Sequence, residues 1–311
     1  MRVAVATGAN APLILEDVEI PEPGPGEVLV RITACGVCYS DLNLLLGHYP
    51  FARFPVIPGH EINGVVTPWG TGSPGRRSVR LCKRITGVVV DGGYAEYALL
   101  KAGYVTPLPA GLDPVAAAPL MCAGLTAFNG LRQGGARAGS RVAVIGAGGI
   151  GALAVRYAVA MGARVAVIGR SPRGGEQAKA LGADLYVATS ETDPVDALKA
   201  WAKGADLILN TAPSTEAAAA TLGGLAPDGT LLLCGYGPEP LVLPTQPMVL
   251  NRLRVAANPS GSPHDLRDTL AFSAAHGILP EVTPITLDEA PATLDAMVAG
   301  TGRGRRVIAF A

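Results

Sequence analysis

Hydrophobic residues in the first third of the chain occur in short runs that are broken by proline and glycine. The runs VRITACG, VIPGHEINGVV and GGYAEYALL lie before about residue 110, and PEPGPGE precedes the first of them. Short apolar runs bounded by turn residues are typical of strands rather than helices. The pattern predicts a β-rich first domain.

The pattern changes at about Pro114, where alanine-rich stretches of helical length begin to alternate with the apolar strands RVAVIG, ARVAVIG, ADLILN and TLLLCG. Strands that alternate with helices form a parallel sheet covered on both faces. After about Pro263 the character is mixed again, and the chain ends in the strand RRVIAF. We therefore expect an α/β chain with a β-rich domain over residues 1–119, completed by 264–311, and a doubly wound domain over 120–263.

Composition narrows the possible partners. The 311 residues suit two domains, and 25 basic residues balance 25 acidic ones. A chain without net charge or a basic stripe favours a small-molecule partner over nucleic acid. Neither a signal-peptide core nor an apolar run of about 18 residues is present, so we expect no membrane partner and a cytoplasmic location. Five cysteines, a small and odd number, indicate reduced thiols rather than a disulfide framework.

A glycine-rich turn follows the strand RVAVIG and precedes a helix and a second strand. Gly146, Gly148 and Gly151 have the GxGxxG spacing, with Gly149 and Ile150 between them. Such glycines allow a tight turn, a close approach of backbone to phosphate and close helix packing, while the helix N-terminus supplies amide donors. A plain glycine-rich bend is the alternative. The strand-turn-helix-strand frame favours a dinucleotide whose pyrophosphate lies on residues 146–151.

Residues after the second strand indicate which dinucleotide binds. NAD-binding proteins normally have Asp or Glu there, whereas this sequence has Arg170, Ser171 and Arg173. With no carboxylate to repel a phosphate and two guanidiniums to hold one, NADP(H) is favoured over NAD(H), and solvated loop arginines are the alternative. Thr211 and Ala212 follow the strand ADLILN, so they are expected to line the nicotinamide site.

Residues with metal-binding chemistry lie in and just after the β-rich region, namely Cys38, the pair His60 and Glu61, and Cys122. Two cysteines and one histidine with an open fourth position make a catalytic zinc site, which polarises a carbonyl oxygen or lowers the pKa of a hydroxyl. Taken singly, each has a plainer interpretation as a packed thiol or a strand histidine. Cys35 and Cys38 also form CxxC, a redox pair or zinc knuckle in other frames.

Five segments occur in one order along the chain, namely CGVCYSDLNLLLG, PVIPGHEINGVV, GGYAEY, MCAGLTAF and GAGGIG. In this order and rough spacing they resemble the zinc-containing alcohol dehydrogenases of the medium-chain dehydrogenase/reductase superfamily. The resemblance covers nearly the whole chain and implies a GroES-like catalytic domain together with a Rossmann domain.

The resemblance also implies roles for single residues at the metal. It places one catalytic zinc on Cys38, His60 and Cys122, with Glu61 as a nearby or transient ligand. Asp41 matches a carboxylate that orients a ligand and tunes the metal.

Two further roles follow from the same resemblance. Ser40 matches the hydroxyl that passes the substrate proton onward. Within the basic run Arg303, Arg305 and Arg306, Arg305 is expected to reach the cofactor pyrophosphate, with solvated surface charge as the alternative.

The sequence departs from the family pattern in three places. The segment between Glu61 and Gly92 holds Cys82 alone, so the four-cysteine lobe for a structural zinc is absent and one zinc is expected. Asn43 occupies the place of a relay histidine, which leaves the proton route to water, the cofactor ribose or another group; nearby His48 is expected to face solvent. Tyr39 stands where a basic residue often contacts phosphate, so that contact is not expected.

The expected function is a zinc-dependent transfer of hydride between NADP(H) and an alcohol, aldehyde or ketone. An NADPH-dependent reductase of activated C=C or C=N bonds is the alternative on the same scaffold, and a non-catalytic NADP-binding sensor or structural protein is the alternative of another class. Relatives pair through an edge strand of the Rossmann sheet, here RLRVAANP, so a homodimer or homotetramer is expected.

Overall fold

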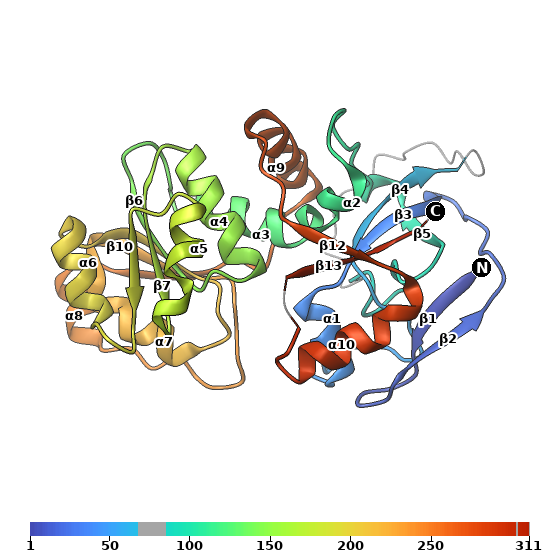
Figure 1. Cartoon of the computed structure of the whole chain (residues 1–311), viewed down its shortest axis with the longest axis horizontal. Helices are drawn as coiled ribbons and strands as arrows, with labels where there is room; N and C mark the ends of the chain where they lie inside the picture. The colour runs from blue at the N-terminus through green and yellow to red at the C-terminus, as the bar shows by residue number, and fades with distance from the viewer. Residues whose placement is uncertain (68–84, 303, 311) are drawn as a thin grey trace. The chain divides into compact units, whose positions relative to one another are not determined.

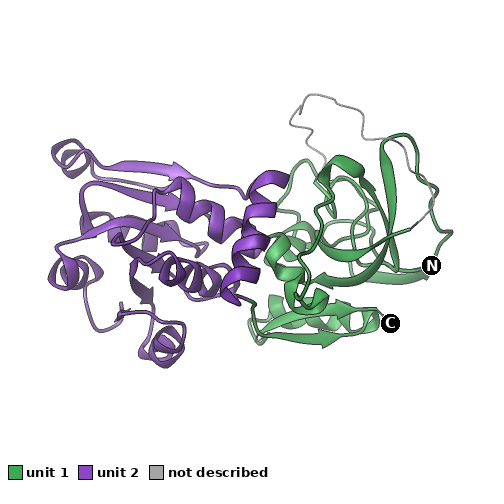
Figure 2. Cartoon of the chain, turned by 90° about the horizontal axis from the view of Figure 1, so that it is seen from above, with its two compact units in different colours: residues 1–122, 279–311 green, residues 123–278 purple. Residues whose placement is uncertain are grey.

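A computed structural model describes residues 1–67, 85–302 and 304–310 of the chain. The described part divides into two compact units, residues 1–122 with 279–311 and residues 123–278 (Figure 2). Cys82, on which the expectation of a missing zinc lobe depends, lies outside the described residues.

The first unit is built on antiparallel strands. Its central sheet has the order β12-β13-β3-β4, with β5 also paired to β3, and β1 and β2 form a separate pair. The elements of this unit are β1 (Arg2–Ala6), β2 (Leu13–Asp17), β3 (Glu27–Gly36), α1 (Tyr39–Leu45), β4 (Glu61–Val66), β5 (Tyr97–Lys101), η1 (Ala102–Tyr104), α2 (Pro114–Ala117), η2 (Ala118–Met121), β12 (Val282–Ile285), η5 (Leu287–Glu289), α10 (Ala290–Val298) and β13 (Arg305–Ala309).

Strand β3 is the organising strand of this sheet, because β4, β5 and β13 all pair with it antiparallel. The pairing of β13 runs from Val307 opposite Gly36 to Ala309 opposite Ala34, so the C-terminal strand joins the N-terminal unit (Figure 1). Ile32 and Ile308 are almost completely buried in the apolar core of the unit. This sheet fixes the beginnings of α1 and β4, where Cys38, His60 and Glu61 lie.

The second unit contains a six-stranded parallel sheet of order β11-β10-β9-β6-β7-β8. Its elements are α3 (Ala123–Gln133), β6 (Arg141–Ile145), α4 (Gly149–Ala160), β7 (Arg164–Gly169), η3 (Pro172–Gly174), α5 (Gly175–Ala180), β8 (Leu185–Ala188), α6 (Pro194–Ala202), β9 (Ala205–Asn210), α7 (Thr215–Thr221), η4 (Leu222–Gly224), β10 (Leu225–Leu233), α8 (Thr245–Leu250), β11 (Arg254–Ala257) and α9 (Pro263–His276).

The parallel sheet explains why its strands are apolar along their whole length. Residues 142–145 of β6 and 165–168 of β7 are buried without alternation, as expected for strands covered on both faces. The strand order reverses direction beside β6, where open α/β sheets bind nucleotides. The predicted α/β fold, with a β-rich domain and a doubly wound parallel sheet, is confirmed.

Helix α9 belongs to the second unit. The ring of Phe272 lies 5.0 Å from that of Phe128 in α3 and 6.1 Å from that of Tyr157 in α4, and the Tyr157 hydroxyl lies 2.7 Å from Ser273 Oγ. This aromatic packing places the boundaries of the compact units after residues 122 and 278, whereas the predicted domain boundaries fall after 119 and 263. The functional assignment of the domains stays a prediction.

Apolar helices in the described residues are short. None of them alone is long and apolar enough to cross a bilayer; the bent pair 114–121 and 123–133 meets the length and composition requirement only when counted together.

Removing the Tyr157 hydroxyl should destabilise the second unit. In Tyr157→Phe the buried Ser273 hydroxyl loses the partner at 2.7 Å, which should lower the free energy of unfolding by about 1–3 kcal/mol. Denaturant titration followed by circular dichroism measures the change. Because Ser273→Ala removes the unpaired group, the double variant should be less destabilised than the sum of the two single variants. Additive losses would contradict the coupling.

Candidate functional site

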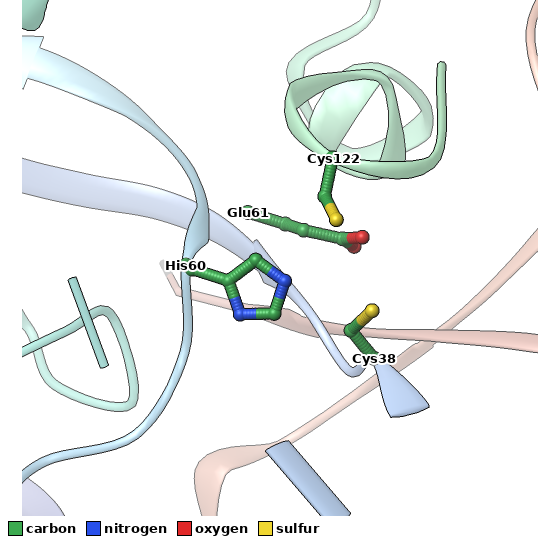
Figure 3. Close-up of side chains that lie close together, drawn as sticks. All are labelled: Cys38, His60, Glu61 and Cys122. Carbon is green, nitrogen blue, oxygen red and sulfur yellow. The ribbon is translucent and has the colours of Figure 1, made fainter. Parts of the chain in front are cut away.

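Four potential metal ligands of the first unit converge. One ligand atom from each of Cys38, His60, Glu61 and Cys122 lies within 4.8 Å of all the others. Cys38 precedes α1, His60 and Glu61 lie at the start of β4, and Cys122 follows η2. Their side chains point toward one another (Figure 3). Residues that are 84 positions apart in the sequence (122 minus 38) thus form one cluster.

The carboxylate of Asp41 fixes the orientation of His60. Its Oδ1 lies 3.1 Å from His60 Nδ1 and accepts a hydrogen bond from the Gly59 amide at 3.2 Å. Its Oδ2 accepts from the Cys38 amide at 2.9 Å and from the Tyr94 hydroxyl at 3.1 Å. A proton on Nδ1 leaves Nε2 of the neutral ring as a lone-pair donor.

The Nε2 atom of His60 is buried and has no hydrogen-bond partner among the described residues. An unpaired acceptor that is buried costs free energy unless something binds it. This atom faces the sulfur atoms of Cys38 and Cys122 (Figure 3). A cation bound by all three side chains would explain why Nε2 has no hydrogen-bond partner in the described part of the chain. The donor set of two sulfurs and one imidazole is that of a catalytic zinc site.

The electrostatics of the cluster also favour a cation. A hydrogen bond from Cys122 holds the pKa of the Cys38 thiol well below its ordinary value, and the nearby His60 adds to the effect. Burial alone lowers the pKa of His60, but the charges of Asp41, Cys122 and Cys38 outweigh it and raise that pKa well above its ordinary value. Asp41 and the Cys38 thiolate therefore place negative charge around the imidazole, whereas the hydrogen bond to Cys38 and burial raise the pKa of the Cys122 thiol well above its ordinary value.

Glu61 and Arg305 form a buried ion pair beside the thiols. The Glu61 side chain is fully buried, and that of Arg305 is 16% exposed. Burial raises the pKa of Glu61 to about 8, although the Arg305 charge opposes the shift. Gly36 makes the pair possible, because a Cβ at that position would overlap the Glu61 carboxylate. The second carboxylate oxygen, Oε2, has no partner among the described residues.

The predicted proton-handling residues lie at the start of α1. Ser40 Oγ is 3.8 Å from Cys38 Sγ, so Ser40 adjoins the cluster. His48 is exposed, as expected, and its Nδ1 lies 3.1 Å from Asn43 Oδ1. Tyr39 is 55% exposed. The structure brings Ser40 to the candidate metal site, whereas its use as a proton carrier stays a prediction.

The glycine turn of the second unit has the geometry of a phosphate cradle. It joins β6 to α4, and Gly146 has a φ of 85°, which side-chain-bearing residues rarely adopt. A Cβ on Gly151 would overlap the Gly146 carbonyl, so that glycine is required for close packing of helix on turn. A Cβ on Gly148 would meet nothing within 4 Å, which leaves open space above the helix N-terminus. The turn fits a dinucleotide pyrophosphate.

Thr211 braces this turn. Its hydroxyl donates to the Ile145 carbonyl at 2.8 Å and lies 3.3 Å from the Gly146 carbonyl oxygen. Thr211 and Ala212 directly follow β9, the neighbour of β6. They therefore lie at the carboxyl edge of the sheet, as predicted, while their contact with a nicotinamide stays a prediction.

The residues predicted to hold a 2′-phosphate follow β7. Arg170, Ser171 and Arg173 are all exposed, and no ion pair to either arginine occurs among the described residues. Their guanidinium groups are thus available to an anion. Arg305 is different, because it belongs to the first unit and contacts Glu61; its predicted pyrophosphate contact stays a prediction.

The sequence did not predict the contacts of two residues that adjoin the metal cluster, Tyr94 and Arg305. Tyr94 lies within the segment GGYAEY, but nothing local predicts that its hydroxyl reaches Asp41, 53 residues earlier. Arg305 was predicted for another role, and its partner Glu61 is 244 residues away in sequence. Tyr94 belongs to the family segment GGYAEY, but that segment does not indicate which residue the Tyr94 hydroxyl contacts.

Comparisons with known proteins agree with this geometry. The alcohol dehydrogenase GroES-like domain family matches residues 24–110, and the zinc-binding dehydrogenase family matches residues 149–275. An alcohol dehydrogenase from Aspergillus sp. (strain MF297-2) is 37% identical, with 98% of this chain and 96% of the relative covered. The NADP-dependent alcohol dehydrogenase C of Mycobacterium bovis is 33% identical, with 97% and 96% covered.

A solved structure shows the same fold. The crystal structure of CAD from Helicobacter pylori, complexed with NADP(H), has a TM-score of 0.84 at 26% identity and covers 99% of each chain. Matches of this identity over nearly the whole length, together with both family domains in the expected order, confirm the resemblance inferred from the motifs. The chain belongs to the zinc-containing alcohol dehydrogenase family of the medium-chain dehydrogenase/reductase superfamily.

Proposed function

We propose that this chain is a zinc-dependent alcohol dehydrogenase that transfers hydride between NADP(H) and an alcohol, aldehyde or ketone. The observation that carries the proposal is the convergence of Cys38, Cys122 and the unpaired Nε2 of His60 within 4.8 Å. A dinucleotide turn in the same chain supplies the other half of the chemistry. Relatives named as alcohol dehydrogenases support the reaction class.

The ligand roles follow from the donor atoms. Cys38 and Cys122 would hold the metal as thiolates and His60 through Nε2, with Glu61 beside them as a transient ligand. Two thiolates would offset the charge of Zn²⁺. The bound zinc supplies Lewis-acid polarisation of the substrate oxygen. Arg305 holds the Glu61 carboxylate when that group is not a ligand.

The proton of the substrate hydroxyl passes first to Ser40, whose Oγ lies beside Cys38. Asn43 has no titratable group and cannot continue the relay as a histidine does. His48 contacts Asn43 and is exposed, so a proton could reach it from Ser40 only through water. Asp41 takes no proton in this scheme and acts by orienting His60.

The cofactor roles rest on the second unit. Residues 146–151 hold the pyrophosphate, and Thr211 and Ala212 line the nicotinamide site. The exposed Arg170 and Arg173 bind the 2′-phosphate that distinguishes NADP(H), and Ser171 adds a hydroxyl donor. The NADP(H) complex of the Helicobacter pylori protein and the NADP-dependent relative support this choice.

Assembly and location belong to the same proposal. Strand β11 is an edge strand of the parallel sheet, so a homodimer or homotetramer formed through it remains the expected assembly. The described cysteines Cys35, Cys38, Cys122 and Cys234 are free thiols, consistent with the expected cytoplasmic location.

Replacing Cys122 should remove the metal and the activity together. Wild-type protein should hold about one zinc per chain. Cys122→Ala should lose most of it, and turnover should fall by about 100-fold or more because zinc contributes several kcal/mol to the transition state. Metal analysis and an NADPH absorbance assay give the two readouts. NADPH binding should survive, since the glycine turn lies in the other unit.

A matched control is Cys234→Ala, which removes a free thiol from the second unit. Cys234 is not among the described residues whose ligand atoms converge, and burial raises the pKa of its thiol to about 12. Zinc content should be unchanged. Full turnover by zinc-free Cys122→Ala would contradict the proposal and favour a reductase of activated C=C or C=N bonds that does not use the metal.

Asp41→Asn should weaken zinc binding by about 10–100-fold, because outer carboxylates of this kind orient the histidine ligand. Chelator competition measures the affinity without reference to activity. Asp113→Asn is the control, since that carboxylate caps α2 in the same unit through the Ala116 amide. Equal affinity of Asp41→Asn and wild type would show that the network around Asp41 does not position His60.

Arg170→Ala should weaken NADPH binding and spare NADH. Loss of one charge-assisted phosphate contact should raise the Kd for NADPH by about tenfold or more. Titration followed by cofactor fluorescence measures both affinities. Arg164→Ala is the control, because this arginine lies at the opposite end of β7, over the ring of Trp201. An unchanged NADPH affinity would reject the 2′-phosphate role of Arg170.

A further inference from the structure

We infer that Tyr186 is a positioning residue for coenzyme selection. It holds the loop of residues 170–174, which carries Arg170 and Arg173, in the conformation that binds a 2′-phosphorylated adenosine. The inference rests on the proposed NADP(H) function and deepens it. Tyr186 lies in β8, opposite Val167 of β7, and the loop follows β7 directly.

The phenol hydroxyl of Tyr186 is bonded to the centre of the loop. It donates a hydrogen bond of 2.6 Å to the Ser171 carbonyl oxygen. Ser171 separates Arg170 from the 3-10 turn at Pro172–Gly174, which contains Arg173. One side-chain hydroxyl thus fixes the backbone between the two guanidinium-bearing residues.

Glycines let the loop close around the phenol. A Cβ on Gly169 or on Gly174 would overlap the Tyr186 hydroxyl oxygen, and a Cβ on Gly175 would lie 3.6 Å from the ring. The backbone on both sides of the arginines therefore lies close to the same phenol, and a side chain at position 169 or 174 would force the Tyr186 hydroxyl to move.

Two backbone hydrogen bonds hold the preceding part of the loop. The Thr189 amide donates to the Gly169 carbonyl at 2.9 Å, and the Ser190 amide donates to the Arg170 carbonyl at 3.1 Å. Together with the bond from Tyr186, three consecutive carbonyls, those of residues 169 to 171, are held by β8 and the residues after it. The third of these bonds is the one that a side chain controls.

The fixed loop backbone should affect the binding of the 2′-phosphate, which NADPH has and NADH lacks. The exposed side chains of Arg170 and Arg173 contact no carboxylate in the part of the chain that the structure describes. A backbone held beforehand reduces the ordering that phosphate binding requires of them. NADH has no 2′-phosphate, so we expect the positions of the two guanidiniums to have little effect on its affinity.

Tyr186→Phe tests the inference, because it keeps the ring and removes only the hydroxyl. Direct titration of the full chain with NADPH and with NADH, followed by cofactor fluorescence, measures binding without turnover. The Kd for NADPH should rise about fivefold, which corresponds to one hydrogen bond, and the Kd for NADH should change by less than about twofold. Tyr157→Phe is the matched control: it removes a tyrosine hydroxyl bond in the same unit but away from the loop, so it should leave the ratio of the two Kd values unchanged.

A double-mutant cycle identifies the route of the effect. If Tyr186 acts through the arginine, the Kd increase of Tyr186→Phe should be smaller in an Arg170→Ala background than in wild type. Equal changes in the NADPH and NADH affinities of Tyr186→Phe, which partial unfolding would produce, would overturn the inference, as would no change in either.

The same titrations separate this inference from the proposed function. Wild type that binds NADH as tightly as NADPH, or an Arg170→Ala variant with unchanged NADPH affinity, would reject the NADP(H) preference and the role of Tyr186 with it. A wild-type preference for NADPH that Arg170→Ala reduces and Tyr186→Phe leaves intact would overturn only the role of Tyr186.

Discussion

Asp41 is 1% exposed, and a carboxylate so far from water is stable only when its oxygens accept hydrogen bonds. Its four donors are the Cys38 and Gly59 amides, His60 Nδ1 and the Tyr94 hydroxyl. They come from the start of α1, the segment before β4 and the segment before β5. Satisfying one buried charge therefore fixes the backbone at Cys38 and next to His60, and it also fixes the tautomer of His60.

A second buried carboxyl group, that of Glu61 at the start of β4, pairs with a residue of the C-terminal strand. Glu61 is fully buried, and its carboxylate is neutralised by Arg305, the first residue of β13. Because β13 pairs with β3, the strand that leads to Cys38, the sheet brings this arginine to the metal cluster. Ion pairing of this kind does not by itself stabilise a fold, since desolvation offsets much of the attraction. It does keep a carboxylate beside the candidate metal without leaving its charge unpaired.

The predicted cofactor-binding loops of the second unit are likewise held by hydrogen bonds, here from side-chain hydroxyls to backbone carbonyl oxygens. Thr211 bonds the carbonyls at the glycine turn, and Tyr186 bonds the carbonyl in the loop after β7. Tyr186 lies in β8, the neighbour of β7, and Thr211 directly follows β9, the neighbour of β6, so each side chain reaches the loop that follows the adjacent strand. Glycines at 151, 169 and 174 permit these approaches, because a Cβ at any of them would overlap its neighbour.

The sequence by itself determined the α/β class and the glycine turn at 146–151, because hydrophobic periodicity and motif spacing are local properties. The four residues of the metal cluster were predicted from the resemblance of five segments to a known family, since each residue taken singly has a plainer interpretation. The tertiary structure decided the partners: that the hydroxyl of Tyr94 reaches Asp41, that Arg305 pairs with Glu61, and that α9 packs on α3 and α4 through Phe272. Each of these contacts joins residues more than 50 positions apart in the sequence. The hydrogen bond from Tyr186 to Ser171 spans fewer positions, but it too depends on the pairing of β7 with β8. Strand order and register set such distances, and no pattern within a single segment encodes them.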